Sequence, residues 1–122
     1  QLLYRRGVVL SRLGRHSDAI SQFTAHLAVQ SNNWDAWSNL ALACKAANDI
    51  ERAVEASVRA AAGAPRSPQI LYNHACILVA ANRLDDAFDA LTNAFALMPG
   101  LRDPALADND LAPLRERLKA PR

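Results

Sequence analysis

The feature that most constrains this chain is an internal repeat of 34 residues. Alanine recurs at that interval, and so does a residue that tolerates a left-handed backbone. The positions in register are Ala19, Ala53 and Ala87, and Gly14, Asn48 and Asn82. A recurring small residue lets two helices approach closely, and glycine or asparagine favours the turn that ends a helix. A two-helix unit repeated in this way must stack on its neighbours to bury its apolar faces.

The ends of the helices are marked by capping residues and by proline. The candidate N-caps are Asn33, Asp49 and Ser67, and the candidate stops are Pro65 and Pro99. A capping side chain accepts a hydrogen bond from the first helical turn, and a proline cannot continue the helical hydrogen-bond ladder. These signals predict helices over 1–13, 16–30, 34–47, 50–62, 68–81 and 84–97.

The composition agrees with an all-α fold. Hydrophobic residues make up 51% of the 122 residues and aromatic residues only 6%, and alanine, a strong helix former, is abundant. The length suits a single domain over residues 1–122. The net charge of +2 comes from scattered basic residues, so we expect no nucleic-acid partner. No apolar run reaches the roughly 20 residues that span a bilayer, so we expect no membrane insertion.

Side chains that could catalyse a reaction or bind a metal do not form a recognisable motif. The candidates are Cys44, Cys76, His16, His26 and His74. The cysteines lack metal-ligand spacing, and the histidines fall in different units on different faces. We therefore expect no enzyme activity, no metal and no cofactor, with both thiols and His74 in the core. Buried free thiols favour a cytoplasmic location, and the periplasm stays open if a signal peptide was removed.

One unit carries a recognisable pattern. It reads Trp37-x-x-Leu40-Ala41-x-x-Cys44, followed by Ala53, Ala60 and Pro65. The pattern resembles the tetratricopeptide repeat, which has an aromatic residue, a Leu-Gly pair, small residues and a closing proline at these spacings. The resemblance implies a right-handed α–α superhelix, a solenoid of three helical hairpins over about 1–33, 34–67 and 68–101. A C-terminal cap over 102–122 would close it.

The cap departs from the 34-residue period. Its run Asp108-x-Asp110-Leu111-Ala112-Pro113-Leu114-Arg115 resembles the tail that closes many bacterial tetratricopeptide domains. A solenoid needs such a cap because its last unit otherwise exposes an apolar face. We expect one final helix near 111–119. Its leucines, Leu111, Leu114 and Leu118, should point inward, and its basic residues, Arg115, Arg117 and Lys119, should face water.

The resemblance also implies which residues face the concave side, where the first helix of each hairpin forms the wall. The implied peptide-binding residues are Tyr4, Arg5, Val8, Arg12, Asp35, Asn39, Leu42, Lys45, Gln69, Tyr72, Asn73 and Cys76. Asn39 and Asn73 lie one unit apart and are expected to stack, either clamping a peptide backbone or simply solvated. One subgroup of the family grips a C-terminal carboxylate with five wall residues, and only Asn39 matches it.

The expected function is a scaffold that binds a protein or peptide partner in the concave groove. The excess of basic over acidic wall residues suggests a ligand with some acidic character. The alternative is a regulatory or assembly module of a larger multidomain protein or of a secretion or envelope complex, with homo-oligomer formation also open. Trp37 is expected in the core, whereas Trp34 could pack on a neighbouring helix or anchor a partner.

Overall fold

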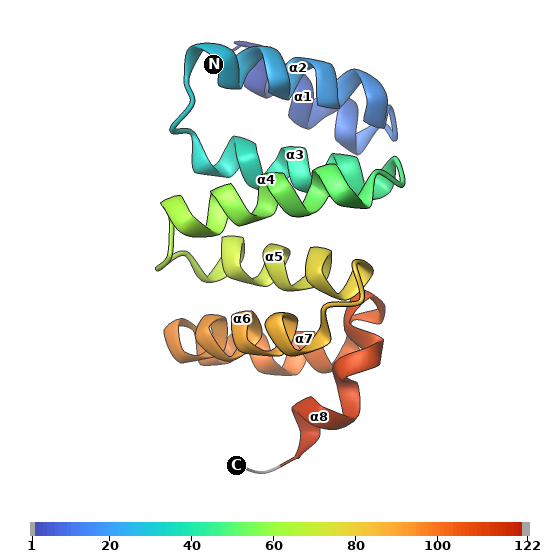
Figure 1. Ribbon diagram of the computed structural model, residues 1–122, viewed down its shortest axis with the longest axis vertical. Coiled ribbons are helices and arrows are strands. Elements are labelled where there is room, and N and C mark those ends of the chain that lie inside the picture. Colours follow the sequence, from blue (N-terminus) through green and yellow to red (C-terminus); the bar gives the residue numbers. More distant parts are fainter. Residues whose placement is uncertain (1, 121–122) are drawn as a thin grey trace.

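The computed structural model describes residues 2–120, so Gln1 and residues 121–122 of the predicted cap lie outside the described residues. Three antiparallel helix pairs are stacked along the long axis of the molecule (Figure 1). They are α1 (Leu2–Arg12) with α2 (His16–Val29), α3 (Trp34–Ala46) with α4 (Ile50–Gly63), and α5 (Pro68–Ala80) with α6 (Leu84–Leu97). The predicted all-α class is confirmed, and each described helix end lies within one residue of its prediction.

The predicted caps and turns account for these ends. The side-chain oxygens of Asn33, Ser67 and Asp49 accept hydrogen bonds from the backbone N–H groups three residues on, at 3.1, 3.3 and 3.3 Å. Each turn between paired helices contains one residue with a positive φ angle. These residues are Gly14, Asn48 and Asn82, with φ angles of 78°, 64° and 59°. All three lie in the left-handed region, which glycine and asparagine adopt at the lowest steric cost. The repeat therefore encodes both where each helix ends and how the chain reverses.

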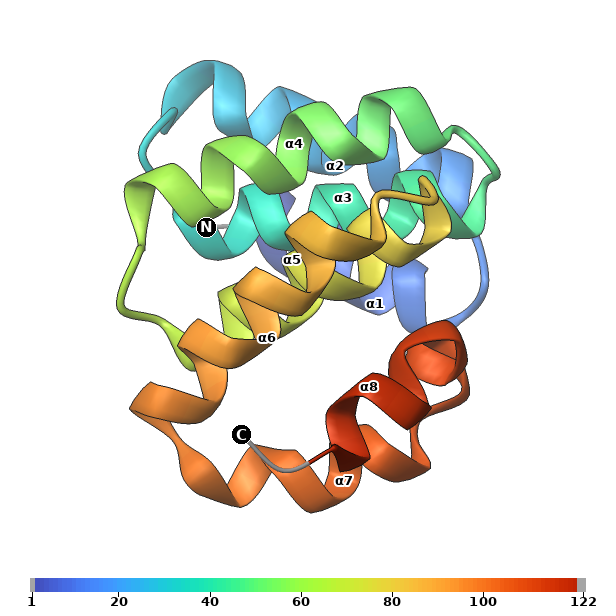
Figure 2. The same ribbon diagram turned by 60° about the horizontal axis from the view of Figure 1, so that its bottom comes forward.

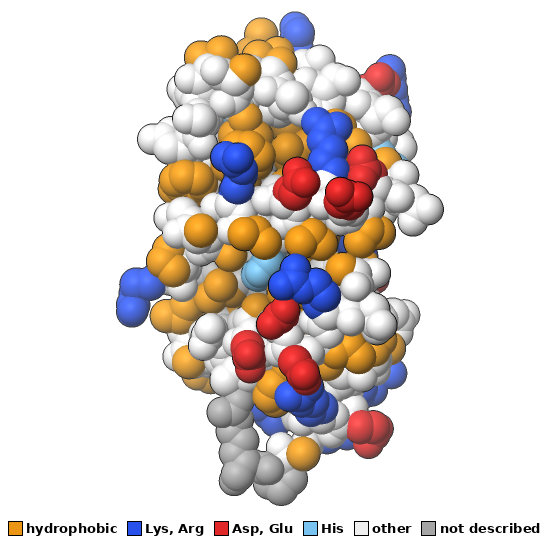
Figure 3. Space-filling view, viewed as in Figure 1, with side chains coloured by type: hydrophobic (Ala, Val, Ile, Leu, Met, Phe, Trp, Pro, Cys, Tyr) orange, Lys and Arg blue, Asp and Glu red, His pale blue; other side chains and the backbone are white. Residues whose placement is uncertain are grey.

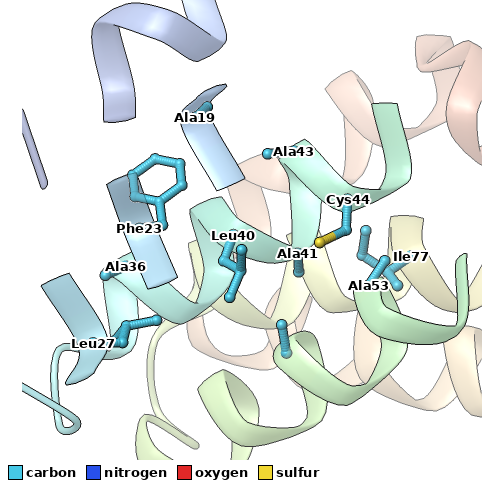
Figure 4. Packing of buried hydrophobic residues seen from close by; sticks show 11 residues of the cluster. Ala19, Phe23, Leu27, Ala36, Leu40, Ala41, Ala43, Cys44, Ala53 and Ile77 are labelled. Atoms are coloured by element: carbon cyan, nitrogen blue, oxygen red, sulfur yellow. The ribbon is translucent and has the colours of Figure 1, made fainter. Parts of the chain in front are cut away.

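The alanines in register lie where the helices of a pair cross. Ala19, Ala53 and Ala87 are each 0% exposed. Figure 4 shows Ala19 and Ala53 pointing into a cluster that runs from α2 to α5. In the first pair a glycine allows an even closer approach, because a Cβ atom on Gly7 would lie 2.6 Å from the ring of Phe23.

The two tryptophans pack differently from each other. Trp34 lies against Gly63 at the end of α4, where a Cβ atom on the glycine would be 2.2 Å from the indole. Trp34 therefore packs on the second helix of its own hairpin. Trp37 packs against the core cluster as predicted, but it lies at the edge of the core and is half-buried. Its indole Nε1 donates to the Ser31 carbonyl at 2.8 Å, and the Arg59 guanidinium lies 5.0 Å from the ring centroid.

The cap is more elaborate than the single helix that the sequence predicts. After a 3-10 turn (Pro99–Leu101) come α7 (Arg102–Ala107), a 3-10 segment (η2, Asn109–Leu114) and α8 (Arg115–Lys119). Pro113 explains part of the difference, because the residue before a proline is disfavoured in the α conformation. Figure 2 shows α7 and α8 beside each other beneath the end of the stack. The three predicted inward leucines are confirmed as buried, at 0%, 1% and 2% exposed for Leu111, Leu114 and Leu118.

One basic residue of the cap departs from its prediction. Arg115 is half-buried, and its guanidinium donates to the Leu106 carbonyl at 2.8 Å. It satisfies a carbonyl group at the end of α7 instead of facing water, whereas Arg117 and Lys119 are exposed as predicted. Arg102 makes a similar bond to the Leu118 carbonyl. The cap is thus held by buried leucines and by arginines that join its short helices.

The stack has two different sides. On one side α3 packs against both α1 and α5, so the first helices form a continuous inner wall. On the other side grooves open between α2 and α4 and between α4 and α6. Helices that are close on one side and separated on the other give the stack a concave and a convex face. Among residues 2–120, no helix combines the length and apolar character needed to cross a membrane.

Candidate peptide-binding groove

Four of the predicted wall residues line one hollow between α1 and α3, with a volume of about 310 Å³. Val8 and Leu42 supply apolar surface, and the Phe23 ring lies beside them. Arg12 and Asn39 supply a cation and an amide. The remaining lining residues are Ser11, His16, Ala43 and Ala46. The sequence analysis missed these four residues because it assigned the wall from the spacing of the family pattern. Ser11 and His16 lie near the turn that follows α1, and Ala43 and Ala46 lie on the flank of α3.

Two buried polar atoms in this hollow are unsatisfied. Ser11 Oγ and His16 Nδ1 have no hydrogen-bond partner within residues 2–120. Such groups are rare in folded proteins because each loses its water without gaining a partner. Both residues line the α1–α3 hollow.

Asn39 is held in place by the preceding first helix. Its Nδ2 donates to the Tyr4 hydroxyl at 3.1 Å, and the Tyr4 ring packs 6.0 Å from the Phe23 ring. Burial raises the pKa of Tyr4, and the negative charge of Asp35 raises it further. The hydroxyl therefore stays protonated at neutral pH. In the described part of the chain nothing donates to the Asn39 carbonyl oxygen, which remains available to a ligand.

Both polar atoms of the Asn73 side-chain amide form hydrogen bonds. Its Nδ2 donates to Ser38 Oγ at 3.1 Å, and its Oδ1 accepts from Gln69 Nε2 at 3.0 Å. Each of the two asparagine amides thus donates to a side chain of the preceding first helix. Ser38 is only 4% exposed, so this bond also satisfies a buried hydroxyl. Asn73 acts chiefly as a link between α3 and α5.

The far end of the wall is covered by the cap. The Tyr72 hydroxyl donates to Asp108 Oδ2 at 2.6 Å, and Lys45 Nζ lies 3.4 Å from Asp110 Oδ2. Burial, and then the bond to Asp108, raises the pKa of Tyr72. Cys76 is only 6% exposed and packs in the same cluster as Leu111. Its predicted place on an open wall is therefore wrong, because the aperiodic tail folds onto the inner face of α5.

This burial gives a prediction for the thiols. Burial raises the pKa of Cys76 to about 12, with the carboxylates of Asp108 and Asp110 adding to the shift, and burial also raises the pKa of Cys44. Because only the thiolate is nucleophilic, native protein at pH 8 should react with dithiobis(nitrobenzoate) about a hundredfold or more slowly than protein in 6 M guanidinium. Rapid modification of Cys76 itself in the native state would place that thiol on an accessible wall after all.

The remaining charged wall residues do not join the hollow. Arg5 lines a separate depression at the N-terminal end of the stack, together with Arg6 and Gln22. Asp35 is exposed in the first turn of α3. The open part of the inner wall is therefore the α1–α3 hollow, whose lining includes the cation of Arg12 and no acidic residue.

Solved structures with the same architecture exist at low sequence identity. The first tetratricopeptide domain of Spaghetti (RPAP3), bound to the HSP90 peptide SRMEEVD, is 15% identical with a TM-score of 0.79, over 96% of this chain and 87% of that one. The translocator chaperone SycD of Yersinia enterocolitica is 18% identical with a TM-score of 0.79, over 97% and 81%. PcrH with the chaperone-binding region of PopD is 20% identical with a TM-score of 0.71, over 96% and 83%.

The sequence matches no protein-family model and no curated protein. The structural similarity nevertheless extends over nearly the whole chain in each case. It shows that the chain has the tetratricopeptide-type all-α solenoid fold. Fold alone does not fix a ligand, so the function must be argued from the hollow itself.

Proposed function

We propose that this chain is a protein-interaction module that binds an extended segment of a partner protein along α1 and α3. The observation that carries the proposal is the α1–α3 hollow, where Val8, Arg12, Asn39 and Leu42 converge. An apolar floor beside one cation and one free amide oxygen suits a peptide better than a small metabolite. Because the cap covers the inner face of α5, the segment would lie mainly against the first two hairpins.

The lining also suggests the chemistry of the segment. Arg12 lines the hollow without any acidic residue, so an acidic side chain on the ligand would gain a charge-assisted hydrogen bond there. An adjacent apolar side chain would pack on Val8 and Leu42. Binding of a partner segment, whatever its charge, is supported by the structural neighbours, which include a domain bound to an HSP90 peptide and PcrH in complex with the chaperone-binding region of PopD.

A binding role without catalysis is part of the same proposal. His26 is bonded to Asn33 at 2.9 Å and His74 to Ser57 at 2.8 Å, on separate hairpins. His74 lines a groove with Asp86, but Ser57 is only 2% exposed and its hydroxyl donates to the Val54 carbonyl at 3.2 Å, so it is not placed to attack a substrate as the serine of a catalytic triad does. Within residues 2–120, no three histidine, cysteine or acidic side chains are grouped so as to hold a metal. The buried, unpaired Cys44 and Cys76 support a reducing, cytoplasmic location.

The double variant Arg12→Glu, Leu42→Glu tests the proposed site. Partners recovered from the source cell on the wild-type chain should bind the variant at least about tenfold more weakly, a loss of about 1.4 kcal/mol, because one change repels an acidic ligand and the other removes apolar contact. Arg66→Glu, in the exposed turn before α5, is the control for a change of charge alone. Equal affinity of wild type and double variant, measured by calorimetry, would reject this hollow as the site.

A further inference from the structure

The convex face carries two grooves that are related by the repeat. One lies between α2 and α4, with a volume of about 390 Å³, and the other lies between α4 and α6, with a volume of about 290 Å³. Seven lining residues of the first groove have a counterpart 34 positions on in the second. The pairs are Thr24 and Val58, Trp37 and Leu71, Leu40 and His74, Arg52 and Asp86, Glu55 and Asp89, Ala56 and Ala90, and Arg59 and Asn93.

The floor of the α2–α4 groove is apolar. Leu27, Leu40 and Ala56 are 5%, 4% and 2% exposed and lie at its base, and the half-buried indole of Trp37 forms one wall. Ala28, a small exposed residue of α2, leaves the groove open on its rim. The space is large enough for one or two bulky side chains of a partner, whose backbone would lie above the groove. Figure 3 shows hydrophobic side chains gathered between α2 and α4, with basic side chains nearby.

The rim of this groove carries two arginines that lie across it. Arg52 Nη2 donates to Thr24 Oγ1 of α2 at 3.0 Å, and the Arg59 guanidinium lies 5.0 Å from the centroid of the Trp37 ring. In the described part of the chain neither arginine forms an ion pair, although Glu55 stands between them on α4. Both cations are thus directed over the groove instead of toward their acidic neighbour. Seven residues of helix separate them, which is about 10 Å, or two turns.

The equivalent groove between α4 and α6 has the opposite charge. Asp86 and Asn93 replace the two arginines, and Asp89 replaces Glu55. The additional cation on this rim, Arg83, is already bonded to Asp86 at 2.8 Å. The two grooves therefore share their architecture but differ in the sign of their rims. That difference selects between ligands by charge, because like charges brought together at an interface are costly.

We propose that the α2–α4 groove binds an amphipathic helix of a partner protein, with an apolar residue flanked by an acidic residue one turn away on each side. A helix lying along the groove presents residues i, i+3 or i+4, and i+7 on one face. The central apolar residue fills the space above Leu40 and Ala56. The acidic residues at i and i+7 are spaced to meet Arg52 and Arg59. This face is separate from the α1–α3 hollow, so the two sites could be occupied together.

The test uses a fluorescent, alanine-based 16-residue helical peptide with glutamate at i and i+7 and leucine at i+3 and i+4. Its affinity for the full chain is measured by fluorescence anisotropy at low salt. The double variant Arg52→Glu, Arg59→Glu is expected to bind at least tenfold more weakly. Ala28→Glu, a change on an exposed helix surface that keeps both arginines, is expected to weaken binding at least threefold. A control peptide carries lysine in place of both glutamates. Its affinity for the wild-type protein should be no higher than the affinity of the acidic peptide for the double variant.

One control separates this site from general attraction to a basic protein. Arg66→Glu changes the same charge away from the groove and should leave the affinity unchanged. Each variant is checked by its helical circular dichroism and its unfolding midpoint. The proposal is overturned if the acidic peptide fails to bind wild type, if it binds the Arg52 and Arg59 double variant equally well, or if Arg66→Glu weakens it as much.

Discussion

Replacing Leu111 with alanine is expected to lower the free energy of unfolding by about 2–5 kcal/mol, the cost of removing a large side chain from a closed core. Leu111 is 0% exposed and lies in a cluster to which α5, α6 and all three segments of the cap contribute. The short helices of the cap cannot be stable alone, since isolated helices of this length are not formed in water. A cavity at Leu111 should therefore loosen the whole cap.

The effect is measured by urea unfolding followed by circular dichroism. Leu13→Ala is the matched control, because it makes the same chemical change at a side chain that is 66% exposed, and should alter stability by no more than about 0.5 kcal/mol. Loss of the cap also predicts faster reaction of Cys76 with thiol reagents in Leu111→Ala. If Leu111→Ala proved as stable as Leu13→Ala, the cap would not be packed on α5 as described.

Replacing Ala53 with leucine is expected to destabilise the protein by about 1–3 kcal/mol, because added methylene groups in a filled core force neighbouring side chains or backbone to move. Ala53 is 0% exposed, and it belongs to the same cluster as Cys44 and Ile77 (Figure 4). The helices of a pair cross at this residue, so a larger side chain must separate α3 from α4. The separation would also disturb the stacking of the next hairpin.

The control for Ala53→Leu is Ala62→Leu on the same helix. Ala62 is exposed, and leucine and alanine have similar helix propensities, so that variant should unfold within about 0.5 kcal/mol of wild type. The comparison separates the effect of leucine on packing where α3 and α4 cross from any effect of leucine on the stability of α4 itself. An Ala53→Leu protein with an unchanged urea midpoint would mean that the recurring alanine does not mark the helix crossing.

The repeated part of the fold could be predicted because its signals are local. Asn33, Asp49 and Ser67 cap the helices that they precede, and Asn48 and Asn82 take up left-handed turns. These features depend on the backbone within a few residues and so can be read from the sequence. The alanine register extends the prediction one step further, since a fixed period implies that each helix crossing is built in the same way.

The cap and its effect on the wall could not be predicted in the same way. Nothing in the local sequence of α5 shows that Tyr72 bonds to Asp108 or that Cys76 is covered, because those contacts come from a segment outside the repeat. Family spacing placed Arg5 on the inner wall, but it lies at the end of the stack. The convex grooves were also missed, since a groove between second helices depends on how far apart successive hairpins sit.

The central claim is that the α1–α3 hollow holds a segment of a partner protein. Site-specific photocrosslinking tests it most directly, with benzoylphenylalanine at Leu42 in the hollow and, for comparison, at Arg66 in the exposed turn. We expect the Leu42 probe to crosslink a short contiguous segment of one partner in the source cell, and the Arg12→Glu change to suppress the product. Crosslinks that form only at Arg66, or that form at Leu42 but persist undiminished with Arg12→Glu, would contradict the account.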